Sequence, residues 1–410
     1  MEQSQEYNSE TMFSLGCDYL YGSNGKEKNI VEAVKWFSNA AEQGHPRGLC
    51  NLGWCYETGS GVTKDVSEAA RLYGLAMERG NVQATFNLAD FYRYGVGVQK
   101  DLQKAFSLYQ QAAEKGHAGG QNAVGQFYTE GIAIQKDVEA GFLWYKKSAS
   151  QGNLNALVNL GVCYEYGRGV AVNKSEAFHC YKLAADGGDK YGQCNLGWCL
   201  ELGIGVTKDY NEAAAWYLKA ANQGLARAQY LLGCYYLYSD DSHRNVSEGV
   251  IWLRKASNQG YASALSQLAL CSYQGTGITK NLEEAARLWM KAGELGITQA
   301  QYNTGVCYHH GEGVQRDYGE AARWYRKAAD SGHVDAMNNL GLILCEGGWG
   351  VDKDLKEGLV WLNKAADKGH PKAKDNIEAI KKRNPSWASS LGGIGASILG
   401  SVIEGLFSDN

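Results

Sequence analysis

The stretch NLGWCYETGSGVTKD at residues 51–65 returns as NLGWCLELGIGVTKD at residues 195–209, with 12 of the 15 letters unchanged. The two copies start 144 residues apart, which is four times 36. The glycine at the third position of both copies, or an alanine in its place, recurs at regular intervals along the chain. These positions are Gly16, Gly53, Ala89, Gly125, Gly161, Gly197, Gly233, Ala269, Gly305 and Gly341. Self-similarity at a fixed period is the signature of a repeat architecture. The sequence therefore predicts ten 36-residue repeats between about residues 8 and 370, with one extra residue in the first and the last.

Each repeat is predicted to form two helices joined by a glycine-rich loop. The second helix begins after an Asp or Asn, whose side chain can accept hydrogen bonds from the first-turn amides. These caps are Asn29, Asp65, Asp101, Asp137, Asn173, Asp209, Asn245, Asn281, Asp317 and Asp354. Eight of the ten have Glu three residues later, which is typical of a capping box. A glycine follows every second helix, which indicates a left-handed position that glycine adopts without a Cβ clash.

The packing between the two helices of a repeat can also be predicted. In repeat six, Gly197 of the first helix is matched by Ala213 near the start of the second helix, and every repeat has Ala or Gly at the second position. Small residues there allow the two helix axes to approach closely. An aromatic pair such as Trp216–Tyr217 follows and is expected to fill the groove between the helices. Because one helix pair cannot bury its apolar face alone, stacked copies are expected to share a continuous core.

The pattern predicts an all-α fold and divides the chain into three segments. Residues 1–7 form an N-terminal tail, and residues 8–380 form the repeat array with a closing half-repeat that begins at Ala373. Residues 381–410 form a Gly/Ser-rich C-terminal tail that is either amphipathic or flexible.

Composition excludes several classes of protein. The net charge is −4 and there is no long basic run, so no nucleic-acid partner is expected. The N-terminus lacks the charged and apolar regions of a signal peptide, and no run of 18 apolar residues predicts a spanning helix. We therefore expect a cytoplasmic protein. Its eleven cysteines are expected to be reduced and to behave as small apolar residues.

The repeats resemble the Sel1-like repeat family, a relative of the tetratricopeptide family. The matching signature is LG-x-x-Y-x-x-G-x-G-V-x-K-D followed by A-x-x-W/Y-Y-x-K-A-A-x-x-G-H, and segments 160–186 and 196–224 meet it almost fully. The resemblance implies a right-handed superhelical α-solenoid of about ten helix-pair repeats, which serves as an adaptor for other proteins. Repeat four departs from the pattern, because Ala133 stands where the second loop glycine belongs.

No enzymatic activity is predicted, because catalytic residues should be unique to one repeat and the residues seen are nearly all periodic. We identify no catalytic, cofactor-binding or metal-binding residue, and no cofactor. Adjacent His309 and His310 point about 100° apart on a helix, so they seldom chelate one ion. Five cysteines share one first-helix position, where packing is expected: Cys55, Cys163, Cys199, Cys271 and Cys307. The alternative function is a β-lactamase-like hydrolase, by analogy with a cysteine-rich branch of the family whose regular cysteine pairs this chain lacks.

The candidate partner-binding surface is carried over from tetratricopeptide arrays, in which the first helix of each pair lines the concave face. The corresponding positions are Asn51, Trp54, Glu57, Asn87, Arg93, Tyr94, Asn159, Glu165, Tyr166, Asn195, Trp198, Glu201, Tyr238, Asn303, His309, His310 and Asn339. Exposed aromatic residues there would supply contact area, and amides can donate to and accept from a peptide backbone. The acidic positions favour a protein or peptide partner with basic segments. Alternatively, the asparagines link neighbouring repeats as a structural ladder.

Residues 384–410 lie outside the repeats and leave three interpretations open. Leu391, Ile394, Ile398, Val402 and Leu406 fall at helical spacing. The segment is a flexible tail, a segment that docks on this chain or a partner, or an interfacial anchor that gives peripheral membrane association. The sequence does not predict the oligomeric state.

Overall fold

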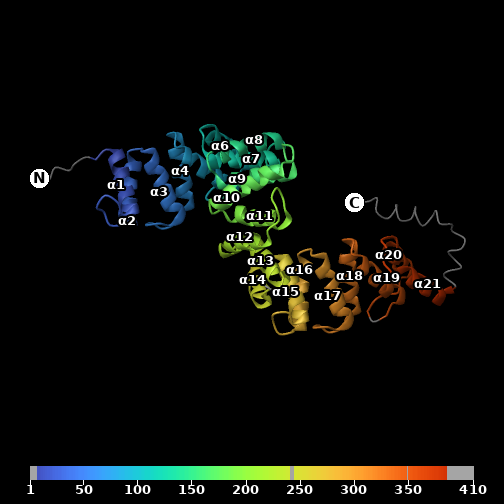
Figure 1. The fold of residues 1–410 in the computed structure, drawn as a ribbon. Helices are drawn as coiled ribbons and strands as arrows, with labels where there is room; N and C mark the ends of the chain where they lie inside the picture. Colours follow the sequence, from blue (N-terminus) through green and yellow to red (C-terminus); the bar gives the residue numbers. More distant parts are fainter. Residues whose placement is uncertain (1–6, 241–243, 349, 386–410) are drawn as a thin grey trace. The chain divides into compact units, whose positions relative to one another are not determined.

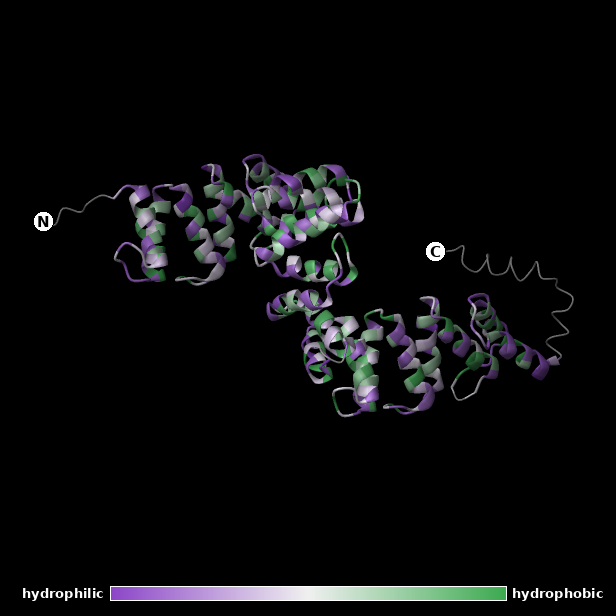
Figure 2. Cartoon of the chain, viewed as in Figure 1, coloured by the Kyte–Doolittle hydropathy of each residue, from purple (hydrophilic) through white to green (hydrophobic). Residues whose placement is uncertain are grey.

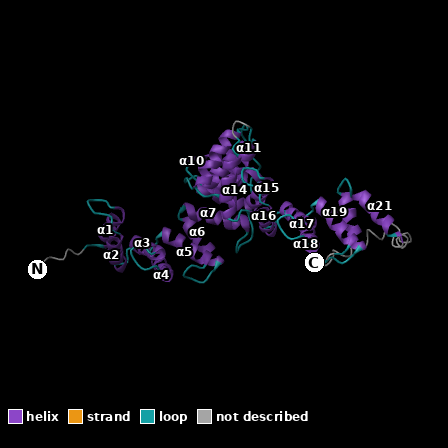
Figure 3. Cartoon of the chain, turned by 90° about the horizontal axis from the view of Figure 1, so that it is seen from below, coloured by secondary structure: helices purple, strands orange, loops and turns teal. Residues whose placement is uncertain are grey.

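The computed structural model describes residues 7–240, 244–348 and 350–385, which form helices joined by loops and contain no named strand (Figures 1 and 3). The all-α prediction is confirmed for these residues. The first twelve helices are α1 (Ser9–Tyr21), α2 (Ile30–Glu42), α3 (Pro46–Thr58), α4 (Val66–Glu78), α5 (Val82–Tyr94), α6 (Leu102–Glu114), α7 (Ala118–Glu130), α8 (Val138–Ala149), α9 (Leu154–Tyr166), α10 (Lys174–Asp186), α11 (Lys190–Leu202) and α12 (Tyr210–Asn222). The others are α13 (Ala226–Tyr238), α14 (Val246–Asn258), α15 (Ala262–Gln274), α16 (Leu282–Glu294), α17 (Thr298–His310), α18 (Tyr318–Asp330), α19 (Val334–Glu346), α20 (Leu355–Asp367) and α21 (Ala373–Arg383).

The chain divides into two compact units, residues 1–220 and 221–410. Helices that follow one another in the sequence pack together from α1 to α11 and from α13 to α21, as expected of a solenoid. Hydrophobic and hydrophilic residues are interspersed along the helices (Figure 2). The helix expected from the closing half-repeat is α21, which buries Ala373, Ile377 and Ile380.

The predicted caps at the start of the second helices are confirmed. Asp65 Oδ1 accepts hydrogen bonds from the amides of Ser67 and Glu68 at 2.9 and 3.0 Å, and the other nine caps accept from the third residue of their helix. The capping-box interpretation is wrong in its second half. The Asp65 amide donates to the Tyr56 carbonyl of the first helix at 3.0 Å, and the Glu68 carboxylate instead binds the Arg71 guanidinium. The cap residue therefore also joins the two helices of a repeat.

The glycines that follow the second helices have the predicted left-handed conformation, with φ between 75° and 93° at all ten. In the loop that joins the two helices of a repeat, Ala133 stands where the preceding repeat has Gly97. Its φ of 58° is positive, close to the 64° of Gly97 at the equivalent position of the preceding repeat. A Cβ at Gly97 would lie 2.2 Å from the Val66 carbonyl oxygen. A side chain at this loop position is thus strained in both backbone conformation and space.

The close approach of the two helices in a repeat is confirmed. A Cβ on Gly161 would lie 2.5 Å from the ring of Tyr181, which is 1% exposed. In the pair Trp216–Tyr217 only the second ring is buried, whereas both rings of Trp324–Tyr325 are, at 7% and 1% exposed. The first ring carries a lysine ammonium above its face, as where Lys219 Nζ lies 3.5 Å from the Trp216 ring centroid. The expectation that both rings fill the groove is therefore wrong for the half-buried Trp216.

Buried glutamines tie some first helices to the preceding helix. Gln121 Nε2 donates to the Ala113 carbonyl at 3.2 Å, and its Oε1 accepts from Gln151 at 2.7 Å. Gln301 takes the place of Gln121 five repeats later, but Ser331 takes the place of Gln151. Among the described residues, nothing donates to the buried Gln301 Oε1. The serine side chain is too short to supply the missing bond.

Candidate partner-binding surface

The last residue of several first helices is an exposed aromatic side chain. In the unit of residues 1–220, Tyr94 is 64% exposed and Tyr166 is 60% exposed. In the second unit, Tyr238 is 65% exposed, and its hydroxyl contacts Gln267 Nε2. Exposed large aromatic rings at one position of a repeat point outward from a common face of the first helices. This position holds the most exposed aromatic residues of the predicted set.

The acidic residues of the set are held by buried tyrosines. Glu57 accepts a hydrogen bond from the Tyr73 hydroxyl at 2.6 Å, and Glu165 accepts one from Tyr181 at 2.8 Å. Glu201 is placed in the same way by Tyr217, at 2.6 Å. Burial, and then the hydrogen bond to Glu57, raise the pKa of Tyr73 above its usual range. Each of these carboxylates is therefore oriented by a hydroxyl from the second helix of its own repeat.

Three predicted residues meet in one pocket of about 260 Å³ on the first helices of repeats two and three. Its lining consists of Glu57, Asn87, Asp90, Phe91, Tyr94 and Val96. The Asp90 carboxylate accepts a hydrogen bond from the buried Tyr109, and burial raises the pKa of Asp90 above its usual value. The pocket therefore combines two oriented carboxylates with an exposed aromatic rim.

The asparagines, all half-buried, do not form one regular ladder. Asn159 Nδ2 donates to Asn122 of the preceding repeat at 3.0 Å. Asn87 and Asn303 instead accept from a glutamine one turn earlier in their own helices, at 2.8 and 3.0 Å. Asn339 accepts from its neighbour Asn338 at 3.2 Å. Asn87 and Asn339 also contact the hydroxyls of Tyr73 and Tyr325 in the preceding repeat, so links between repeats occur but not as one row of asparagines. The remaining two asparagines of the set are Asn51 and Asn195.

The other predicted residues are divided between the two units. Arg93 donates to Gln126 of the next repeat at 2.9 Å, and Trp54 is 39% exposed. Trp198 is half-buried. In the second unit, His309 packs against His310 with ring centroids 4.7 Å apart, and burial lowers the pKa of His309. The predicted set therefore contributes to two surfaces, one on each unit.

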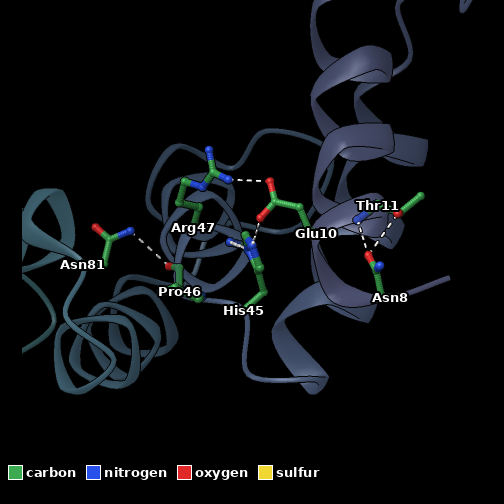
Figure 4. A network of polar contacts seen from close by, with 8 residues as sticks. Asn8, Glu10, Thr11, His45, Pro46, Arg47 and Asn81 are labelled. Atoms are coloured by element: carbon green, nitrogen blue, oxygen red, sulfur yellow. Dashed lines mark hydrogen bonds and ion pairs between the residues drawn. The ribbon is translucent and has the colours of Figure 1, made fainter.

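A larger pocket of about 500 Å³ lies at the other end of α5. It is lined by Phe13, Pro46, Arg47, Cys50, Asn51, Arg79, Gly80, Asn81, Val82 and Gln83. Figure 4 shows its wall, where Glu10 accepts from both His45, at 2.9 Å, and Arg47. These two hydrogen bonds lower the pKa of Glu10. His45 Nδ1 accepts from the Gly48 amide at 3.0 Å, so His45 caps α3.

The cysteines are free thiols in a packed environment. Burial raises the pKa of Cys163 to about 11 and that of Cys307 to about 12. A reactive cysteine needs the opposite shift, so these thiols do not have the character of nucleophiles. In the part of the chain that the structure describes, no three His, Cys, Asp or Glu side chains are grouped as metal ligands require, and no helix is long and apolar enough to cross a membrane. The anchor interpretation of residues 386–410 lies outside the described residues.

Sequence reasoning missed several residues of this surface. Tyr21 has the same repeat position as Tyr94 and is 73% exposed, and Leu202 is 44% exposed. The register of Gly16 and Gly197 could have found both. Asp90 shares the position of Trp54 but differs from it in chemistry. Arg79 follows a second helix, which the comparison of first helices leaves out.

Comparison with known proteins accounts for the repeats. The Sel1 repeat pattern matches ten consecutive segments, at residues 9–45, 46–81, 82–117, 118–153, 154–189, 190–225, 226–261, 262–297, 298–333 and 334–370. The chain belongs to the Sel1 repeat family. The predicted period and the extra residue in the first and last repeats are both confirmed. Sel1 repeat proteins generally serve as scaffolds for protein interactions.

Solved Sel1 repeat structures have the same fold. The c5321 protective antigen of uropathogenic Escherichia coli is 33% identical with a TM-score of 0.71, over 92% of this chain and 80% of that chain. A Sel1 repeat protein from Oxalobacter formigenes is 29% identical with a TM-score of 0.55, over 60% of this chain and 96% of that chain. These relatives confirm the α-solenoid architecture.

Curated relatives share only short segments with this Sel1 repeat chain. Activator of C kinase protein 1 of Saccharomyces cerevisiae is 43% identical over 51 residues, 12% of this chain and 8% of the relative. The HRD3A component of an ERAD-associated E3 ubiquitin-protein ligase of Arabidopsis thaliana is 34% identical over 59 residues, 14% of this chain and 9% of the relative. The match spans less than a tenth of either relative's length.

Proposed function

We propose that this Sel1 repeat chain is a non-enzymatic scaffold that binds a protein or peptide partner on the exposed face of its first helices. The observation that carries the proposal is the exposure of Tyr94 and Tyr166, at 64% and 60%. Tyrosine supplies a large contact area at a small entropic cost and is enriched among interface hot spots. The equivalent residue is Glu130 in the repeat between them, so the position varies as recognition requires and as packing does not.

The charges of the same face support a partner with basic residues. Glu57, Glu165 and Glu201 each accept a hydrogen bond from the hydroxyl of a buried tyrosine, which orients the carboxylate. An oriented carboxylate costs a partner less ordering entropy than a mobile one. A cytoplasmic location belongs to the proposal and is supported by the eleven free thiols. The hydrolase alternative has no observation in its favour in the described residues, since burial opposes ionisation of the repeated cysteines.

The test is a binding measurement on the full chain. The partner is captured with the tagged protein, identified by mass spectrometry, purified and titrated. Changing both Tyr94 and Tyr166 to Ala should weaken binding at least about tenfold, which corresponds to roughly 1.4 kcal/mol. Tyr210→Ala is the matched control, because Tyr210 is 56% exposed but begins a second helix. If the double variant keeps its helical content and full affinity, the binding surface lies elsewhere.

A further inference from the structure

Two pockets adjoin along one side of α5. The 500 Å³ pocket includes Gln83 near the start of this helix, and the 260 Å³ pocket includes Asn87, Asp90 and Tyr94 further along it. Gln83 Nε2 donates to Asn87 Oδ1 at 2.8 Å, so the two pockets are joined by a bonded pair of amides one turn apart. Both pockets lie within the unit of residues 1–220.

The two pockets carry opposite charge. In the larger pocket, Arg47 is paired with Glu10, while the exposed Arg79 donates only to the Leu75 carbonyl among the described residues. One positive charge is therefore left without a carboxylate. In the smaller pocket, Glu57 and Asp90 accept from neutral tyrosine hydroxyls.

The positive charge of Arg93 lowers the pKa of Asp90, against the larger effect of burial. The Arg93 guanidinium also donates to Gln126 at 2.9 Å. It offsets part of the charge of the two carboxylates and leaves the pocket negative. The face of α5 is consequently positive at its N-terminal end and negative at its C-terminal end.

The distance between the pockets suits a short extended segment. Val82 and Tyr94 are the first and last residues of α5. At a rise of about 1.5 Å per residue they are about 18 Å apart along the helix axis. An extended chain advances about 3.3 Å per residue, so five to six residues cover roughly this length.

We propose that this face binds one extended protein segment in a fixed direction, with an acidic side chain in the Arg47–Arg79 pocket and a basic side chain in the Glu57–Asp90 pocket, about five residues further along. The inference rests on the proposed function and names the chemistry of its ligand. Between the charges, the amides of Asn51 and Asn87 can donate to and accept from a peptide backbone, whereas Gln83 is bonded to Asn87 and His117. This lining fits a polypeptide better than a small ion.

The rim of the acidic pocket fits the stem of a basic side chain. Tyr94 is 64% exposed and Val96 is 36% exposed, and both line the pocket beside the carboxylates. Lysine and arginine bury an aliphatic stem along apolar surface while their charged ends remain with polar groups. The Arg93 guanidinium already lies over the Tyr94 ring, 5.3 Å from its centroid, so the contact proposed for this ring is with the aliphatic stem.

The experiment uses a defined array of Ser/Ala peptides that each contain one Glu and one Lys. The two charges are separated by two to eight residues, in both orders, and the array is probed with the full-length protein. Binding should peak when the charges are about five residues apart, and one order should bind at least tenfold more tightly than the other. Equal binding of the two orders, no dependence on separation, or no binding of any peptide would overturn the inference.

Charge reversal identifies the pockets. Arg79→Glu should weaken the best peptide at least tenfold, and replacing the peptide's Glu by Lys should restore binding to this variant. Lys115→Glu is the matched control, because Lys115 follows its helix in the next repeat and lines neither pocket. Equal effects of the two reversals would show that net charge, and not this face, is responsible.

The acidic pocket is tested with a second pair of matched variants. Glu57→Gln should weaken the peptide, whereas Glu165→Gln changes an equivalent hydrogen bond to a buried tyrosine outside the pocket and should not. The proposed function fails separately from this inference. If Tyr166→Ala weakens capture of the natural partner while Arg79→Glu and Glu57→Gln do not, the scaffold proposal stands and the directional site on α5 is wrong.

Discussion

The close contact between Gly161 and Tyr181 predicts that Gly161→Ala destabilises the unit of residues 1–220. The new Cβ would lie 2.5 Å from Cε1 and 2.8 Å from Cδ1 of the ring. Carbon atoms prefer a separation of about 3.5–4.0 Å. The ring has little freedom to move, because Tyr181 is 1% exposed and its hydroxyl donates to Glu165 at 2.8 Å.

Two opposing terms set the magnitude of this change. Overpacking a core typically costs roughly 1–3 kcal/mol. Alanine is favoured over glycine inside a helix by about 1 kcal/mol. Gly161→Ala should therefore lower the free energy of unfolding by up to about 2 kcal/mol.

Gly74→Ala is the matched control in the same unit. Gly74 lies inside α4, and an added Cβ would meet nothing within 4 Å. This variant should gain about 1 kcal/mol of stability. Helix propensity contributes equally to both variants. The difference between their free energies of unfolding therefore measures the overpacking alone and should be roughly 1–3 kcal/mol.

The assay is urea unfolding of the full chain followed by far-ultraviolet circular dichroism. Adding Tyr181→Ala should reduce the penalty of Gly161→Ala in a double-mutant cycle, because it removes the ring atoms that the new Cβ would meet. If Gly161→Ala stabilises the protein as much as Gly74→Ala does, the argument that these glycines are required by helix approach is refuted.

Three further predictions concern single repeats. Ala133→Gly should raise the stability of its unit by up to about 1 kcal/mol in thermal melts, because it relieves a left-handed alanine; an unchanged or lower melting temperature would contradict the strain. Ser331→Gln should add roughly 1 kcal/mol in urea unfolding by donating to the orphaned Gln301 oxygen, and this gain should vanish when Gln301 is changed to Leu. Burial lowers the pKa of His117 and of His333 below the usual 6.5, so their contribution to stability is complete above about pH 6.5 and declines as the pH falls below it. Asn caps the first helix of repeats three and five, so both histidines can be changed to Asn. The double variant should lose less stability than the parent protein between pH 7.5 and about 5.5 in unfolding curves. An equally steep loss would show that other groups cause it.

The helix pairs were predictable because each repeat solves the same packing problem ten times. A cap such as Asp65 and a close-approach glycine such as Gly161 recur at a fixed spacing, and averaging over ten copies separates them from chance. The second half of the capping box failed for a tertiary reason. The cap amide that the Glu68 side chain was expected to bind is already used by the Tyr56 carbonyl of the other helix.

The candidate surface was less predictable, because its residues acquire their roles from partners in another helix. In the sequence Glu57 looks like an ordinary surface acid. Its orientation depends on the Tyr73 hydroxyl, which donates to it from 16 residues away. Arg79 and Asp90 lie at positions whose residue type changes between repeats, so the period gives no signal for them. The division of the chain after residue 220 is likewise not marked in the repeat pattern, since the same motif continues through it. The three-segment division of the chain and the interpretation of its C-terminal tail stay predictions.

Site-specific photocrosslinking in native cells tests the central claim most directly. A photoreactive amino acid is placed at position 166 and, in a separate variant, at position 143. Tyr166 and Leu143 are similarly exposed, at 60% and 57%, but Tyr166 ends a first helix and Leu143 lies on a second helix. The scaffold account predicts a discrete protein adduct from position 166 and only background from position 143. Adducts from position 143 with none from position 166 would contradict it, because they would place the partner on the opposite set of helices.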